Sequence, residues 1–268
     1  MTFKLPLSLL IAGTSACLGL AAPAVAQPLT NNTPNTVNPL TTPVGTLDFV
    51  FTHRFDTNGG PSNNQFEASP TFALTTGILP QLDAELNFAT ASGVNAAVSN
   101  GRELEALLKY RCFPEAARLQ LTLMGGYNTA AISGDAAVMA SYDVGPLNVR
   151  AVGKAFTSGQ GVGGKTVALG AGAIWHVNPN WGLAADYSLA PWSQNPLSTS
   201  PVLPVWSLGA NFLIPLSPHS FQLYATNANT LTLQGTSVGD SFVRYGFAFL
   251  IPFSSLDRYL SIFNPTKD

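Results

Sequence analysis

The chain has 268 residues, of which 46% are hydrophobic and only 10% are charged, and its formal net charge is −2. Soluble globular domains carry about 25% charged residues, so this composition could hardly cover a surface exposed to water. The hydrophobic fraction is nevertheless ordinary, which excludes a bundle of membrane-spanning helices. No basic stripe is present that could bind nucleic acid.

The first 26 residues are typical of a secretory signal peptide. Lys4 supplies the positive charge, an apolar stretch runs over residues 7–20, and Ala24-Val25-Ala26 forms a small-residue cleavage site. The apolar stretch is short and is interrupted at residues 13–15, which argues against a transmembrane anchor. A lipoprotein that carries its lipid on Cys17 is a minor alternative.

Residues 27–43 are rich in Asn, Thr and Pro and show no apolar period, which predicts a flexible N-terminal segment. Cleavage after Ala26 would leave Cys112 as the only cysteine, so we expect no internal disulfide. Cysteines and histidines nowhere share the spacing of a metal site, and we expect neither a metal nor a cofactor.

From residue 44 to residue 253 the dominant signal is alternation with a period of two. In the first such segment Leu47, Phe49 and Phe51 share one face, while Asp48 and Thr52 lie on the other. This pattern indicates β-strands with one apolar and one polar face, most of them long enough to cross a tilted path through a bilayer. The predicted strands are 45–55, 65–78, 82–91, 102–112, 118–127, 134–143, 147–156, 166–176, 181–190, 203–214, 219–227 and 240–252.

The connections between these strands alternate between long and short. Those expected to be long are 56–64, 93–101, 128–134, 157–165, 191–202 and 228–239, whereas 79–81, 113–115, 144–146, 177–180 and 215–218 are short and carry Pro or Gly. This rhythm is typical of outer-membrane barrels, which have short periplasmic turns and longer outer loops. We therefore predict an all-β fold, a transmembrane antiparallel up-and-down barrel of twelve strands over residues 44–253, with both ends in the periplasm.

Aromatic residues recur near the predicted strand ends, where the interfacial girdles of a membrane barrel belong. They are Tyr110, Tyr127, Trp181, Tyr187, Trp206 and Phe212. The alternative interpretation is a secreted β-sandwich with ordinary core aromatics, but a sheet this apolar would expose sticky edges to water.

The charged residues fall on the polar face of the strands. A Lys or Arg on the lipid face at mid-membrane would cost about 2–4 kcal/mol, so we expect these side chains to face the lumen. The candidate lumen residues are Asp48, Arg54, Glu67, Asp83, Glu85, Glu103, Glu105, Lys109, Arg111, Arg150, Lys154, Asp186 and Arg244.

Two roles are open for these lumen charges. Strand pairing predicts Arg54 near Glu67, and Asp83 and Glu85 near Lys109 and Arg111, which would make an ion-pair ladder that braces a filled or narrow barrel. Alternatively, the charges line a path that selects small polar solutes. In that case the residues that would attract anions are Arg150, Lys154 and Arg244.

The inward residues of the later strands are small, which leaves room for a solute, a lipid tail or an inserted loop. They are Ala168, Gly170, Gly172, Gly182 and Ala184.

The last predicted strand resembles the C-terminal sorting signal of outer-membrane proteins. The residues that carry the resemblance are Arg244, Gly246, Phe249, Ile251 and Phe253. The resemblance implies recognition by the barrel-assembly machinery of a diderm bacterium. The chain continues beyond Phe253, and Leu256, Tyr259, Leu260 and Phe263 lie at helical spacing, which predicts a short periplasmic helix in residues 254–268.

Three further motifs resemble a bacterial β-barrel family that is known only as a domain of unknown function. They are His53-Arg54-Phe55, Lys109-Tyr110, and the run from His219-Ser220-Phe221-Gln222 to Thr226-Asn227. Since that family has no assigned activity, the resemblance implies a fold and no ligand.

Together these features predict a narrow porin-like channel or facilitator for small polar solutes in the outer membrane, surrounded by lipid. A structural or adhesive surface barrel without transport is the alternative. A barrel hydrolase is a weaker one, because no Gly-x-Ser-x-Gly is present and the three histidines lie on different strands. We therefore do not expect an enzyme.

Overall fold

A computed structural model describes residues 29–36, 38–56, 67–95, 99–161, 164–190 and 202–254, with only the backbone described for Glu67 and Ser254. The predicted signal peptide and the predicted C-terminal helix lie outside these residues. Within them, no helix is long and apolar enough to span a membrane.

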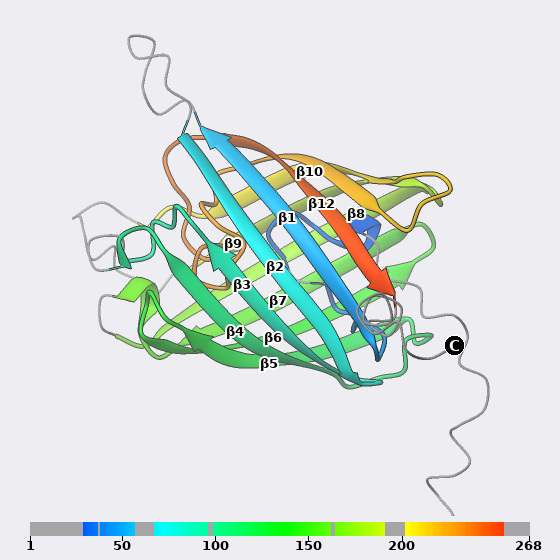
Figure 1. The fold of residues 1–268 in the computed structure, drawn as a ribbon, viewed down its shortest axis with the longest axis horizontal. Coiled ribbons are helices and arrows are strands. Elements are labelled where there is room, and N and C mark those ends of the chain that lie inside the picture. The colour runs from blue at the N-terminus through cyan, green and yellow to red at the C-terminus, as the bar shows by residue number, and fades with distance from the viewer. Residues whose placement is uncertain are drawn as a thin grey trace, which may run out of the picture.

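Twelve antiparallel strands form a closed barrel, in which every strand pairs with its neighbours in the sequence and the last pairs with the first (Figure 1). The predicted fold class is thus confirmed, and each predicted segment overlaps one strand. The strands are β1 (Thr46–Asp56), β2 (Glu67–Leu79), β3 (Leu82–Ala89), β4 (Glu103–Arg111), β5 (Leu119–Asn128), β6 (Ser133–Val144), β7 (Leu147–Phe156), β8 (Thr166–Asn178), β9 (Trp181–Leu189), β10 (Val205–Leu213), β11 (Ser220–Thr226) and β12 (Arg244–Ser254). The described residues also include two short 3₁₀ turns, η2 (Leu29–Asn31) and η3 (Gly159–Gly161).

The seam between β1 and β12 is as regular as the rest of the wall. It runs from Thr46 opposite Ser254 to Phe55 opposite Tyr245 without a register shift. A closed sheet leaves no edge strand, so the backbone N–H and C=O groups of the wall are paired with one another.

The two ends of the barrel differ in their connections. At one end, here called the short-turn end, β2–β3, β6–β7 and β8–β9 are joined by tight turns, and β1 begins and β12 ends there. The other end, the long-loop end, carries the longer connections. One expectation was wrong: β5–β6 at the long-loop end is joined by residues 129–132 only, whereas β4–β5 at the short-turn end uses residues 112–118. The strands β5 and β6 extend further than the alternation indicated, since residues 128 and 133 still pair.

The outer face of the barrel is apolar. Exposed side chains from successive strands include Leu74, Leu86, Leu108, Leu123, Val138, Val149, Leu169, Leu183, Leu208 and Leu223. Exposed aromatic residues lie near both ends, with Tyr110, Tyr142, Trp175 and Trp181 at the short-turn end and Tyr127, Tyr187 and Tyr245 at the long-loop end. This is the surface that acyl chains and headgroups require.

The N-terminal segment lies inside the barrel, contrary to the flexible spacer that its composition favoured. We call the described residues of 29–43 the plug. Most of its side chains are buried, among them Leu29, Thr33, Asn35 and Thr42. The physical reason is that Asn and Thr, which suit a solvated linker, equally suit a polar lumen that supplies hydrogen-bond partners.

The connection between β11 and β12 also folds inward. We call its residues 228–239 the inner loop. Residues 230 and 232–234 of this loop are at most 1% exposed. Figure 1 shows this connection turning back among the strands instead of extending away from the long-loop end. The plug enters from the short-turn end and the inner loop from the opposite end, so together they fill the barrel.

We predict that Gly246→Ala destabilises the barrel and Gly125→Ala does not. A Cβ at Gly246 would lie 2.4 Å from the backbone oxygen of His53 across the seam, whereas one at Gly125 would meet nothing within 4 Å. Overpacking of this kind costs about 1–3 kcal/mol. The free energy of unfolding in urea, followed in detergent micelles by the heat-modifiable gel band, measures both variants. Equal stability of the two would show that the seam is not tightly packed.

Candidate functional site: the filled lumen

The candidate lumen charges lie on the interior face of the wall. Glu85 is half-buried and the side chain of Glu67 lies outside the described residues. The others are buried, with at most 7% exposed: Asp48, Arg54, Asp83, Glu103, Glu105, Lys109, Arg111, Arg150, Lys154, Asp186 and Arg244. On β12, Arg244 and Gly246 point inward, while Phe249, Ile251 and Phe253 alternate with them on the outer face.

The plug is tied to the wall along its whole length. At its start the Leu29 amide donates to Ser220 Oγ (2.8 Å), and at its end the Thr42 amide donates to Asp83 (2.9 Å). At its deepest point Asn35 donates twice to the carboxylate of Asp186, from its amide (2.9 Å) and from Nδ2 (3.0 Å). The plug is therefore a loop that reaches past the middle of the lumen and returns.

Arg54 joins the plug to the inner loop. Its guanidinium donates to the carbonyl of Thr230 in the inner loop (2.7 Å), and to the carbonyl of Pro34 (3.3 Å) and Asn35 Oδ1 (3.1 Å) in the plug. The ring of Tyr224 lies 5.6 Å from the guanidinium carbon. One fully buried cation thus holds both inserted segments, because the N–H groups of its planar guanidinium point to acceptors on two sides.

Carboxylates on β4 hold the inner loop from the other side. Glu103 accepts hydrogen bonds from Thr230 (3.2 Å) and Thr232 (2.6 Å), and Glu105 accepts the amide of Leu233 (2.9 Å). These charge-assisted bonds replace the water that the carboxylates would otherwise bind.

A lysine and an amide complete the anchoring of the inner loop. Lys154 Nζ donates to Thr236 Oγ1 (2.7 Å) and to its carbonyl (3.0 Å), and Gln234 Nε2 donates to Asp135 (2.9 Å). The ammonium of Lys154 is therefore occupied by the loop and does not face an open path.

The expected ion-pair ladder is largely replaced by hydrogen bonds to the inserted segments. Among the described residues four ion pairs form: Lys109–Asp83 (3.0 Å), Arg111–Glu115 (3.9 Å), Arg244–Asp56 (3.3 Å) and Arg244–Asp240. The predicted proximity of Asp83 and Lys109 is confirmed by their direct register. Arg54 stands opposite Ser69, two residues from Glu67 on β2, and its guanidinium turns to the plug and the inner loop.

Small inward residues on the later strands make room for the plug. A Cβ on Gly209 would lie 3.0 Å from Pro34, and one on Gly172 would lie 3.4 Å from Thr33. Of the three occupants that the small residues left open, the inserted loop is the one found here.

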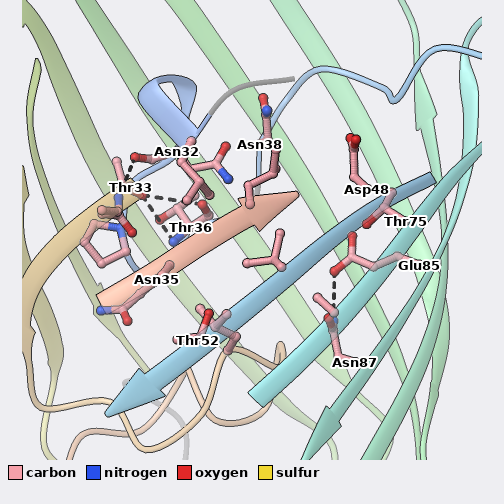
Figure 2. Close-up of a pocket in the computed structure, with 18 of the residues that line it drawn as sticks. Asn32, Thr33, Asn35, Thr36, Asn38, Asp48, Thr52, Thr75, Glu85 and Asn87 are labelled. Atoms are coloured by element: carbon pink, nitrogen blue, oxygen red, sulfur yellow. Dashed lines mark hydrogen bonds between the residues drawn. The ribbon is translucent and has the colours of Figure 1, made fainter. Parts of the chain in front are cut away.

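Between the plug and the wall formed by β1–β4, β11 and β12 there is a cavity of about 120 Å³, here called the plug cavity. Figure 2 shows Asp48, Thr75 and Glu85 close together on one wall of it, with Asn32, Thr33, Thr36 and Asn38 of the plug opposite. The plug cavity has room for several water molecules.

A second cavity, of about 310 Å³, opens toward the short-turn end. It is lined by Arg150, His176, Asp143 and Asn148 of the wall and by residues 38–40 of the plug. Arg150 donates to Asn148 (2.6 Å) and to the backbone oxygen of Asn31, so this cation is in part bound to the plug.

The three histidines are separated from one another: His176 lines the second cavity, whereas His53 and His219 pack against aromatic rings. His53 lies among the rings of Phe51, Phe55 and Phe247, and His219 lies 5.6 Å from the ring of Phe249. In the part of the chain that the structure describes, no histidine side chain is hydrogen-bonded to a serine, and no group of His, Cys, Asp and Glu could hold a metal ion.

Sequence reasoning missed the residues of the inserted segments that bind the charges. They are Asn35 and Thr42 in the plug and Thr230, Thr232 and Gln234 in the inner loop. One signal in the sequence could have indicated them. Many charged residues on the polar strand faces have no residue of opposite charge directly across from them, so they need other partners inside the barrel.

No protein-family model and no curated protein matches the sequence. The fold is similar to that of the KdgM porin, with a TM-score of 0.52 and 8% identity over 78% of this chain and 99% of that chain. A structure of the KdgM porin in complex with disordered oligogalacturonate gives 0.51 with the same identity, over 78% of this chain and 99% of that one. An outer-membrane channel from Pseudomonas putida F1 gives 0.47, with 18% identity over 81% of this chain and 99% of that chain. At 8% identity the likeness to the KdgM porin concerns the fold alone.

We predict that removing Arg54 loosens the plug. The reporter is Thr36→Cys in a Cys112→Ser background, because Thr36 is buried in the plug and Cys112 is a free thiol. A bulky maleimide should label this cysteine several times faster when Arg54→Ala is added, since the bonds to Pro34 and Asn35 are lost.

The control for this experiment is Ile132→Cys, at a position in the β5–β6 connection that is 65% exposed. It should react rapidly and equally in both proteins. Equal labelling of Thr36→Cys with and without Arg54 would contradict the assignment of Arg54 as the residue that holds the plug.

Proposed function

We propose that this protein is a narrow outer-membrane channel for small polar solutes, in which the plug and the inner loop block the path until they are displaced. The observation that carries the proposal is the contrast between the two faces of the wall. The outer face is apolar from girdle to girdle, whereas the inner face is lined with charges and holds two cavities along its length. A wall of this kind separates lipid from a polar interior, as in a pore.

The way in which the plug is held favours displacement. Its contacts are hydrogen bonds such as those of Asn35 with Asp186 and of Thr122 Oγ1 with the carbonyl of Pro39 (2.6 Å). Apart from the peptide chain that continues into β1, the plug is held to the wall without a covalent bond in its described residues, and these residues carry no charge. Each such bond exchanges for one with water at a net cost of about 0.5–1.5 kcal/mol, so water that enters the lumen can replace the plug's partners.

The proposed location in the outer membrane is supported by the apolar outer face and the polar interior, together with two signals near the ends of the chain. The signal peptide at residues 1–26 would export the chain, and the strand that ends near Phe253 would be recognised by the barrel-assembly machinery. The short-turn end would then face the periplasm, and the plug would enter from that side. Membership of the uncharacterised barrel family with the His-Arg-Phe motif stays a prediction.

A structural or adhesive surface barrel is the second candidate, and the filled lumen favours it. If the plug and the inner loop never leave, the cross-links through Arg54, Glu103 and Lys154 act as internal bracing, and only the outer loops could interact with a partner. A hydrolase has less support, since the described histidines make no contact of the kind that activates a serine.

Planar-bilayer conductance of the refolded protein separates the two candidates. A variant that lacks residues 27–43 and in which a short Gly/Ser linker replaces residues 228–239 should conduct several-fold more than the full mature chain, because the plug and the inner loop together fill the lumen. Heat modifiability shows whether each variant is a closed barrel, and Leu216→Ala, at a fully exposed turn residue, serves as the unchanged control. A closed barrel without the plug and the inner loop that stays silent at all voltages would contradict the channel and leave the structural barrel.

A further inference from the structure

We propose that the plug cavity is a binding site for a small organic cation, with an ammonium group at one end and a short apolar part at the other. This inference rests on the proposed function in so far as it names the class of solute that the channel would accept. The binding site itself is argued from the cavity.

One wall of the plug cavity is acidic. Asp48 on β1 stands directly opposite Thr75 on β2, which in turn stands opposite Glu85 on β3. The three residues therefore form a row across neighbouring strands, and Figure 2 shows their side chains together at one side of the cavity. Two carboxylates and a hydroxyl thus face the same space, and all three offer oxygen acceptors.

The carboxylates of this row have unused acceptor capacity. Asp48 is 4% exposed; its Oδ2 accepts from Thr42 Oγ1 (3.1 Å), while its Oδ1 has no hydrogen-bond partner. Glu85 accepts from Asn87 Nδ2 (2.8 Å). Within the described chain neither carboxylate forms an ion pair with a Lys, Arg or His.

The nearby lysine does not neutralise the row. Lys109 lines the cavity, but its ammonium pairs with Asp83 at 3.0 Å. With Asp48 and Glu85 ionised, the cavity therefore carries an excess of negative charge. A buried carboxylate without a cation is costly, and an ammonium group supplies both the charge and three donors.

An apolar patch lies beside the acidic row and sets the rest of the ligand, since Val50 follows Asp48 on the inner face of β1 and stands opposite Leu250 on β12. It consists of Leu29, Val50, Tyr224, Ala248 and Leu250, which pack together as one buried cluster. Four of these residues belong to the wall of the lumen, and Leu29 belongs to the plug. A volume of about 120 Å³ admits only a short chain, since pockets for drug-sized molecules span roughly 300–1,000 Å³.

The test uses n-butylammonium and its two isosteres, n-butanol and butyrate, titrated calorimetrically into the full mature protein in detergent micelles. We expect n-butylammonium to bind, n-butanol to bind about tenfold more weakly because it lacks the charge, and butyrate not to bind. The proposal is overturned if n-butylammonium does not bind, or if butyrate or n-butanol binds as tightly.

Variants of the acidic row locate the site. Asp48→Asn and Glu85→Gln should each weaken n-butylammonium binding about tenfold, while Glu115→Gln, which removes the same charge from an exposed side chain on the β4–β5 turn, should leave it unchanged. Two row variants are used so that the site can still be tested if one of them fails to close, as judged by heat modifiability. Unchanged affinity in a closed row variant would place binding elsewhere and overturn the proposal.

Binding and conduction can fail separately. If the full mature protein binds n-butylammonium in micelles but the variant without the plug and the inner loop stays silent in a bilayer, the cation site is supported and the channel is contradicted. Conduction without binding of any of the three compounds would support the channel and contradict the cation site.

Discussion

The structure depends on one constraint: the outer face of the wall must meet hydrocarbon, while the inner face encloses polar groups. In a bilayer every backbone N–H and C=O must find a partner, and only a closed sheet achieves this with strands. Closure then sorts the side chains by parity, so that Leu108 faces lipid while Lys109, the next residue, is 4% exposed inside. Sheet, surface and lumen therefore follow from one alternation in the sequence.

The polar interior creates a second requirement, because charged groups removed from water need partners. Opposed charges on neighbouring strands meet this need at Asp83 and Lys109. Elsewhere the chain brings its own polar segments into the lumen, and Glu103 and Arg54 are satisfied by hydroxyls, amides and carbonyls of the inner loop and plug. The filling of the barrel is thus the counterpart of the charge on its wall, and whatever displaces the filling must solvate the same groups.

The strands of the wall can be predicted from the sequence, whereas the segments that fill the lumen cannot. Period-two patterns located all twelve strands, because a one-residue slip would place a charge such as Arg150 in lipid. The plug was misjudged, since the composition of residues 27–43 is equally compatible with a solvated linker and with a polar lumen. Contacts such as Asn35 with Asp186 join residues 151 positions apart and depend on how the ring closes, which no local pattern records.

The seam joins the first strand of the wall to the last. Until residues 244–254 are in place, the wall is an open sheet with two unpaired edges. Such edges promote aggregation in water, and in lipid their backbone groups would have no hydrogen-bond partners. Arg54 lies on β1, and the segment to which it is hydrogen-bonded, around Thr230, connects β11 to β12. Closure of the barrel and insertion of the segments that fill it are consequently one cooperative step. A chain that ended before β12 would have neither a continuous wall nor an enclosed interior.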